Sequence, residues 1–280
     1  AYVDEAVATS LVEKKPNPGK IVSENKIEEI GVTEIVFENG LKVNLKPTDF
    51  KNDEIKFRGT SWGGNSLYED ADFMNAAFSS MIASTSGNGN LKASALSKFM
   101  SGKVAQVNAS VGGTTEGISG SSSVKDFETA LQMVYNRFTN NKLDPEAAKG
   151  ALANQKDFML NMEKTPTPEK VFNDSVQVVM GNGAYRAQPM TSERMAKVDP
   201  EKAMKIFSER FNNASDFEFT FVGNFDIEKI KPLLATYLGG IPGTQKKETF
   251  RDLNIVPPSG KISKIVKKGT EDKARVLLTY

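Results

Sequence analysis

The feature that most constrains the fold is a two-residue turn, Asn39-Gly40, between two short apolar runs. Residues 34–37 (EIVF) precede the turn and residues 41–45 (LKVNL) follow it. Asparagine and glycine both tolerate the positive φ of a tight hairpin turn, and the flanking residues favour paired strands. Polar and apolar residues then alternate over 54–61 (EIKFRGTS), as in a strand with one buried face. The sequence therefore predicts an antiparallel sheet near the start of the chain.

Helical periodicity dominates the sequence after this first sheet segment. Apolar residues recur on one face of a 3.6-residue repeat between residues 73 and 82. Further helices are predicted over residues 91–100, 124–138, 145–162, 168–180, 200–211 and 227–237. Additional strands are predicted over residues 103–110, 115–121 and 216–221. This order predicts an α+β fold, a mainly antiparallel sheet with helices packed on one face.

The predicted elements divide the chain into three parts. Residues 1–30 are charged and contain an NPGK turn, which is typical of a linker from a preceding lobe. Residues 31–242 form the predicted α+β domain. Residues 243–280 become polar around Pro257-Pro258 and then alternate, which predicts a connector and the first strands of a following domain. Because this alternation continues to Tyr280, we expect the chain to be a piece of a longer protein.

Two residue types, histidine and cysteine, are absent from the sequence. Histidine is the commonest ligand of catalytic zinc and the usual base of hydrolytic triads, so a HExxH-type site and a Ser-His-Asp triad are excluded. The lack of cysteine excludes disulfides, thiolate nucleophiles and cysteine-bound metals. Carboxylate-only Mg²⁺ or Ca²⁺ sites, paired carboxylates and Ser-Lys dyads remain chemically open.

The charge balance gives no general affinity for nucleic acid or for an anionic membrane. The 36 Lys and Arg residues against 35 Asp and Glu residues leave a formal net charge of +1. No apolar run approaches the roughly 20 residues of a membrane-spanning helix. The glycines at Gly112-Gly113 fit neither a P-loop nor a dinucleotide-binding pattern, and we interpret them as a turn between two strands.

Three segments of the sequence follow one another in an informative order. The first, GVTEIVFENGLKVNLKPTDFKNDEIKFRGTSWGGNSLYED, contains a hairpin, a K-P-T-x-F turn and a GG-x-S stretch. The second, LSKFMSGKVAQVNASVGGTTEGISGSSSVKDFETALQMVYNRFTN, joins a helix to a strand pair and a further helix. The third, FEFTFVGNFDIEKIKPLLATYLGGIP, is a strand followed by a helix. Together, over about residues 30–245, they resemble the second half of the insulinase/pitrilysin family of zinc peptidases.

The resemblance implies an insulinase/mitochondrial-processing-peptidase-like metallohydrolase fold without an active site. Active family members bind zinc through an inverted His-x-x-Glu-His helix and a Glu on a later helix, and the Glu within the motif is the general base. The matching positions here are Asn75 and Ser79 on the first helix and Phe158 on a later one. The resemblance therefore implies no catalytic, cofactor-binding or metal-binding residue in this segment. An Arg/Tyr pair of the family's second half, which helps to bind the substrate backbone, is expected downstream.

The resemblance also implies a function for the segment within a larger protein. It is expected to form part of the wall of an enclosed, peptide-degrading chamber and to be inactive alone. Zinc is expected in a separate zinc-bearing lobe, either N-terminal on the same polypeptide or on a partner subunit, and peptides are the expected substrates. The family and the missing cysteine favour export to a bacterial periplasm or cell surface.

Two other functions remain open from the sequence. Some relatives of this fold are non-enzymatic core or scaffold subunits of larger assemblies. A zinc-binding HxxEH motif several hundred residues before Ala1 would favour the peptidase half, and its absence would favour the scaffold. An independent carboxylate-based hydrolase is the third hypothesis, although no specific motif supports it.

Overall fold

The computed structural model describes residues 10–279, which divide into two compact units. Within these residues the first unit comprises 10–151 and 197–251, and the second comprises 152–196 and 252–279. The helix α4 (Pro145–Lys164) begins in the first unit and ends in the second. Residues 1–9 of the predicted linker lie outside the described residues.

The first unit is built on a seven-stranded sheet with the order β1-β2-β3-β7-β4-β6-β5. Its strands are β1 (Ile21–Ile27), β2 (Val32–Phe37), β3 (Lys42–Pro47), β4 (Ile55–Trp62), β5 (Ala105–Val111), β6 (Thr115–Ser122) and β7 (Glu218–Gly223). Every neighbouring pair is antiparallel except β3 and β7, which run parallel. The predicted α+β fold with a mainly antiparallel sheet is confirmed, and Asn39-Gly40 lies in the hairpin between β2 and β3.

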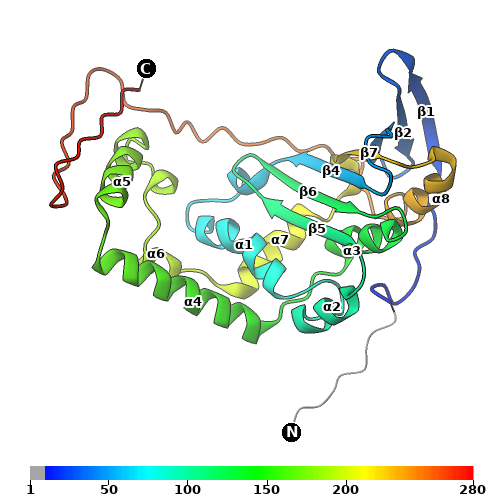
Figure 1. Ribbon diagram of the computed structural model, residues 1–280, viewed down its shortest axis with the longest axis horizontal. Helices are drawn as coiled ribbons and strands as arrows, with labels where there is room; N and C mark the ends of the chain where they lie inside the picture. Colours follow the sequence, from blue (N-terminus) through cyan, green and yellow to red (C-terminus); the bar gives the residue numbers. More distant parts are fainter. Residues whose placement is uncertain (1–9, 280) are drawn as a thin grey trace, which may run out of the picture. The chain divides into compact units, whose positions relative to one another are not determined.

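The helices of the first unit lie against one face of this sheet (Figure 1). They are α1 (Phe73–Thr85), α2 (Ala93–Met100), α3 (Phe127–Thr139), α7 (Pro200–Arg210) and α8 (Ile227–Tyr237), with 3-10 turns η1 (Glu28–Ile30), η2 (Gly64–Leu67) and η4 (Ala214–Asp216). On β4 the inward side chains of Ile55 and Phe57 are buried, whereas Lys56 and Arg58 are exposed on the other face. The alternation of β4 therefore separates a helix-covered inner face from a bare outer face.

Phenylalanine side chains fill the space between the inner face and the helices. Phe219 and Phe221 of β7 have ring centroids 6.0 Å apart, and Phe57 of β4 lies 5.3 Å from Phe221. Phe138 of α3 packs 6.5 Å from Phe219. Gly59 is paired with Phe219 in the strand register, and a Cβ atom at Gly59 would overlap the Phe219 ring. The missing side chain of Gly59 therefore makes room for the Phe219 ring.

The second unit contains the end of α4, then α5 (Pro168–Met180), η3 (Tyr185–Ala187) and α6 (Ser192–Met195). Thr167 caps α5 by accepting a hydrogen bond from the Lys170 amide at 3.1 Å. Glu163 of α4 accepts hydrogen bonds at 2.6 Å from both the hydroxyl and the amide of Ser192, and these lower the pKa of Glu163. Among residues 10–279, no helix is long and apolar enough to cross a membrane.

The structure differs from the sequence-based prediction at both ends of the domain. Residues 21–27, which were expected to belong to a linker, form the edge strand β1, because pairing with β2 stabilises a strand whose own side chains are almost all exposed. The predicted strands over 261–266 and 274–280 are not present in their described residues, since no neighbouring strand supplies ladder hydrogen bonds. The domain boundaries at residues 30 and 242 stay a prediction.

Candidate functional site

Two of the three predicted remnants of a zinc site lie on α1, where they make structural hydrogen bonds. Asn75 is 4% exposed, and its Oδ1 accepts a hydrogen bond from the amide of Asp199 at 2.8 Å. Asp199 is the residue that caps α7. Ser79 is fully buried, and its Oγ donates to the carbonyl of Ala76 at 2.8 Å. Asn75 therefore joins the start of α7 to α1, whereas the hydroxyl of Ser79 makes its hydrogen bond within its own helix.

The third predicted position, Phe158, belongs to the part of α4 in the second unit and is 56% exposed. A phenyl ring offers no lone pair to a metal ion. Over the described chain, residues 10–279, no group of three or more acidic side chains is arranged to hold a metal ion. The correspondence of these three positions to a zinc-binding set stays a prediction.

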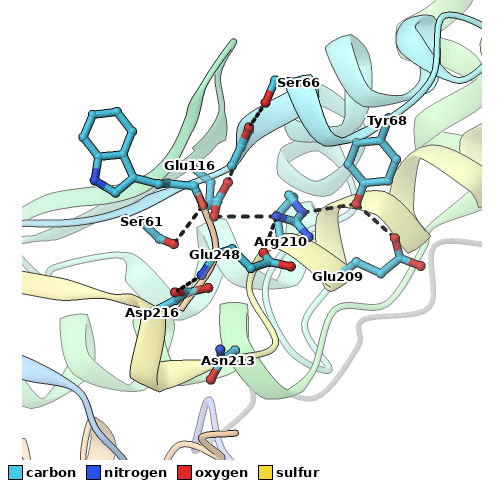
Figure 2. Close-up of polar contacts among 12 residues, drawn as sticks. Ser61, Ser66, Tyr68, Glu116, Glu209, Arg210, Asn213, Asp216 and Glu248 are labelled. Carbon is cyan, nitrogen blue, oxygen red and sulfur yellow. Dashed lines mark hydrogen bonds and ion pairs between the residues drawn. The ribbon is translucent and has the colours of Figure 1, made fainter. Parts of the chain in front are cut away.

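A buried charged cluster lies where β4 leaves the sheet, between α7 and η2 (Figure 2). The Arg210 side chain is 9% exposed, and its Nη1 lies 2.7 Å from Glu248 and 3.9 Å from Glu116. The Glu116 side chain is 1% exposed. Arg210 Nε donates to the hydroxyl of Tyr68 at 3.2 Å, and this hydroxyl donates to Glu209 at 3.0 Å. We call Glu116, Arg210, Glu248 and Tyr68 the Arg210 cluster.

Two consecutive glycines allow the backbone to reach this cluster. Gly63 has φ +140° and Gly64 has φ +58°, conformations that residues with a side chain rarely adopt. The Gly64 amide donates to Glu116 at 2.7 Å. A Cβ atom at Gly63 would come within 2.8 Å of Arg210, so a side chain there would displace the guanidinium. The two glycines of the GG-x-S stretch therefore give the cluster a backbone donor and the space for the guanidinium.

Burial and charge act in opposite directions on the members of the cluster. Burial raises the pKa of Glu116, although the hydrogen bond from Gly64 and the charge of Arg210 oppose the increase. Burial disfavours the charge of Arg210, but Glu248, Tyr68 and Glu116 outweigh it and raise the pKa of Arg210. Burial also raises the pKa of Tyr68. The guanidinium of Arg210 is therefore a permanent cation that lies between two carboxylates and a neutral phenol. These contacts hold the end of α7 against β6, the residue after η2 and the segment that carries Glu248.

We expect the stability of the fold to depend on pH through Glu116. Because the folded pKa of Glu116 lies above its ordinary value of 4.5, the folded state binds this proton more tightly than the unfolded state. The contribution of the proton to stability is complete below pH 4.5 and is lost as pH rises through the folded pKa. Glu116→Gln should flatten this part of the profile of unfolding free energy against pH, measured by urea denaturation. An unchanged slope above pH 4.5 would contradict the expectation.

The segment after α8 is fixed to the first unit near the same cluster. We call residues 243–251 the strap. Arg251 Nε donates to the carbonyl of Ser66 at 2.9 Å, and the Arg251 amide donates to the hydroxyl of Ser66 at 3.0 Å. The ring of Phe250 lies 5.5 Å from that of Trp62. Glu248 of the Arg210 cluster belongs to the strap, so the predicted connector begins with a segment docked on the domain.

Sequence reasoning missed the Arg210 cluster because its members come from distant parts of the chain. Glu116 was the available signal. It is the only acidic residue between 112 and 123, and it shares the inward side of its strand with Ile118. A carboxylate at an inward strand position needs a buried partner. The sequence pattern predicts this need but does not name Arg210 as the partner.

The outer face of the sheet carries mostly polar side chains. Its side chains come from five strands: Lys42, Asn44 and Lys46 of β3, Thr220 of β7, Lys56, Arg58 and Thr60 of β4, Ser119 and Ser121 of β6, and Gln106, Asn108 and Ser110 of β5. A hollow of about 600 Å³ is lined by residues of β4, β5 and β6 together with Met133 of α3. These amides, hydroxyls and cations suit binding, and on the same face Lys42 forms ion pairs with Glu34 of β2 and Glu218 of β7.

The chain is similar in sequence and in fold to proteins of one peptidase family. The family model described as peptidase M16 inactive domain matches residues 198–280. A protein of Arabidopsis thaliana named zinc protease PQQL-like is 31% identical over 239 residues, which is 85% of this chain and 22% of that protein. The crystal structure of the periplasmic protease PqqL from Escherichia coli superimposes with a TM-score of 0.75 at 20% identity, covering 90% of this chain and 27% of that one.

The chain thus spans about a quarter of the length of the relatives that it matches. The fold is also similar to the first half of E. coli PqqL, with a TM-score of 0.63 at 12% identity over 83% of this chain and 50% of that structure. At this identity the likeness concerns the fold alone. The ordered motifs, the matched inactive domain and the Arabidopsis relative together identify the chain as a member of the insulinase/pitrilysin family, peptidase family M16, corresponding to its non-catalytic half.

Proposed function

We propose that this chain forms part of the non-catalytic wall of an enclosed peptide-degrading chamber. The zinc and the catalytic residues would lie on a separate lobe, on the same polypeptide or on a partner subunit. The substrates would be peptides, as expected for a relative of proteins named zinc proteases. The contribution of this segment would be to exclude water and confine the peptide while the other lobe cleaves it.

The observation that carries the proposal is the use of Asn75 and Ser79 on α1. The helix on which the family resemblance places the zinc ligands here makes packing contacts, since the Asp199 amide donates to Asn75 and the Ser79 hydroxyl donates to the carbonyl of Ala76. Restoring a zinc site would require new ligands and the loss of these contacts. The bare outer face of the sheet supports the same function, because it offers polar groups for an enclosed chain to contact.

The test is to compare the chain alone with the chain in the presence of a zinc-bearing lobe. The chain alone, dialysed against zinc and measured by plasma mass spectrometry, is expected to hold less than one equivalent and to cleave no quenched fluorescent peptide. Addition of the zinc-bearing lobe encoded with it should produce cleavage that neither part shows alone. One tightly held zinc per isolated chain, or peptide cleavage by it, would refute the proposal.

A different outcome would favour a scaffold subunit. If the chain binds the zinc-bearing lobe but leaves its rate of peptide cleavage unchanged, the segment organises an assembly and does not take part in turnover. We also propose export to the periplasm, on the analogy of the E. coli protease described as periplasmic. Cell fractionation against a periplasmic marker tests this location, and recovery in the cytoplasmic fraction would reject it.

A further inference from the structure

The strap, residues 243–251, is held on the first unit although it contributes no buried side chain. Its residues from Gly243 to Phe250 are exposed, Arg251 is half-buried, and the segment forms neither a helix nor a strand. Burial of apolar surface is the main source of stability in a fold, so the strap lacks the contribution that fixes the core. Its attachment therefore depends on hydrogen bonds, ion pairs and the ring contact between Phe250 and Trp62.

The first part of the strap is bound by η4 and by the residue that caps it. The Thr244 amide donates to Oδ1 of Asn213 at 3.0 Å, and Nδ2 of Asn213 donates to the carbonyl of Lys246 at 3.0 Å. The ammonium group of Lys247 donates to the carbonyl of Ser215. The amide side chain of Asn213 thus holds two residues of the strap at once.

The middle of the strap is bound through Glu248 (Figure 2). The Glu248 amide donates to Oδ1 of Asp216 in η4 at 2.8 Å. The Glu248 carboxylate lies 2.7 Å from Nη1 of Arg210, the last residue of α7. The backbone and the side chain of one strap residue therefore attach to two different elements of the first unit.

The end of the strap is bound by η2 and by the residues that follow it. The Arg251 guanidinium donates to the carbonyls of Ser66 at 2.9 Å and Tyr68 at 2.6 Å, and it pairs with the carboxylate of Glu69. The Arg251 amide donates to the hydroxyl of Ser66 at 3.0 Å. Arg251 is the last residue of the first unit, so this attachment fixes the chain where it leaves the unit.

Release of the strap would leave the rest of the first unit intact. None of residues 243–251, all of which the structure describes, belongs to the buried core or to a strand of the sheet. When Glu248 leaves, Arg210 still has Glu116 at 3.9 Å and the hydroxyl of Tyr68 at 3.2 Å. Because the buried cation keeps these partners, release avoids the large cost of an uncompensated buried charge. Opening of the strap therefore costs less than unfolding of the sheet.

We propose that the strap opens and closes as one body while the first unit stays folded. Closed, it fixes the chain as far as Arg251; open, it leaves residues 243–251 as a flexible tether before residues 252–279. The carboxylates of its two ion pairs, Glu248 and Glu69, are 45% and 77% exposed, so salt weakens both pairs and shifts the strap toward the open form. This device needs no zinc-bearing lobe and is therefore tested separately from the proposed chamber function.

The direct test is native-state amide hydrogen exchange in the 280-residue chain, followed by NMR at low concentrations of urea. The amides of Thr244, Glu248 and Arg251 all donate to side chains of the first unit, so their protection factors should agree within about threefold. These amides should exchange at least about a hundredfold faster than those of β7, with little dependence on urea. Exchange at the rate of β7, exchange as fast as in an unstructured peptide, or three unrelated protection factors would overturn the proposal.

A substitution at the middle attachment tests whether the strap moves as one body. Glu248→Gln removes the ion pair with Arg210 but keeps the amide donor and the size of the side chain. It should speed exchange of the Thr244 and Arg251 amides about fivefold, the effect of one partly exposed ion pair, and leave β7 unchanged. Thr249→Ala, at the exposed neighbouring position, is the matched control, with exchange expected within about twofold of the parent. If Glu248→Gln speeds only the amide of residue 248, the strap frays piece by piece and the proposal is refuted.

Limited proteolysis measures the same opening in an independent way. Trypsin cuts after lysine, and the carbonyl of Lys246 and the ammonium group of Lys247 are both engaged in the closed strap. Because cleavage of a transiently opened segment follows the population of its open form, Glu248→Gln should speed cleavage at these lysines by the same factor as exchange. An unchanged rate of cleavage would contradict the opening. If Glu248→Gln fails to fold in a thermal melt, the exchange measurement on the parent chain decides.

Ionic strength provides the test of control by charge. An increase of sodium chloride from about 0.05 M to about 0.5 M should speed exchange of the strap amides relative to β7 about threefold, because the ion pairs are screened. The same increase should have a smaller effect on Glu248→Gln, in which only the pair between Arg251 and Glu69 remains. Strap exchange that does not respond to salt, or that responds equally in both chains, would overturn the ionic control of the strap.

Discussion

Replacing Arg210 by alanine is expected to lower the free energy of unfolding by about 3–5 kcal/mol, because a buried ion pair that loses one partner leaves a buried charge uncompensated. The loss has three sources in this structure. Glu116 and Glu248 lose their shared cation, and Tyr68 loses the donor at 3.2 Å. Urea denaturation followed by circular dichroism measures the change.

Matched variants separate the cluster from the helix that carries it. Lys205→Ala lies on α7 as well, but Lys205 is exposed and pairs only loosely with Glu209 at 3.9 Å, so we expect a change below about 0.5 kcal/mol. Combining Arg210→Ala with Glu116→Gln should cost less than the sum of the two single changes, because the second removes the uncompensated charge. Additive effects would mean that Glu116 and Arg210 are not coupled.

Truncating Phe219 to alanine is expected to be comparably damaging, at about 3–5 kcal/mol. The Phe219 ring is fully buried and faces Gly59, which has no side chain to collapse into the space. The surrounding rings of Phe138 and Phe221 are themselves packed against other elements, so the cavity persists. Thermal and urea unfolding of the purified variant measure the effect.

A second substitution at Gly59 gives this prediction its own control. Gly59→Ala alone should destabilise the protein, since its Cβ atom would overlap the Phe219 ring. In the Phe219→Ala background the same substitution should be neutral or stabilising, because the methyl group then fills empty space. If Gly59→Ala costs the same in both backgrounds, the ring and the glycine do not share one space.

Most of the fold could be predicted because its elements are marked locally. The turn at Asn39-Gly40 and the caps at Thr167-Pro168, Asp199-Pro200 and Asp226 each act within a few residues, and helices α5 and α8 begin and end where the sequence predicts. The strand β1 escaped prediction because Glu24 and Lys26 break its apolar pattern and its stability comes from β2. A local sequence pattern cannot show that a strand is stabilised by pairing with a neighbouring strand.

The candidate site was much less predictable than the fold. The absence of histidine excluded a HExxH-type zinc site immediately, yet the hydrogen bond from Asp199 to Asn75 joins residues 124 positions apart. Arg210 and Glu116 are likewise brought together only by the tertiary fold. The position of β5 at one edge of the sheet likewise depends on the order of strands, which the sequence pattern alone does not fix. Sites made of distant residues need the structure.

The position of β7 has a consequence for how the chain can be assembled. β3 and β4 follow one another in sequence but do not pair, because β7 lies between them. Until residues 218–223 have left the ribosome, the chain can form only two separate three-stranded pieces, each with an unsatisfied inner strand. The sheet is therefore completed late, through contacts between distant residues. A nascent chain that stops before Glu218 exposes the unpaired backbone edges of β3 and β4, which can pair with other chains.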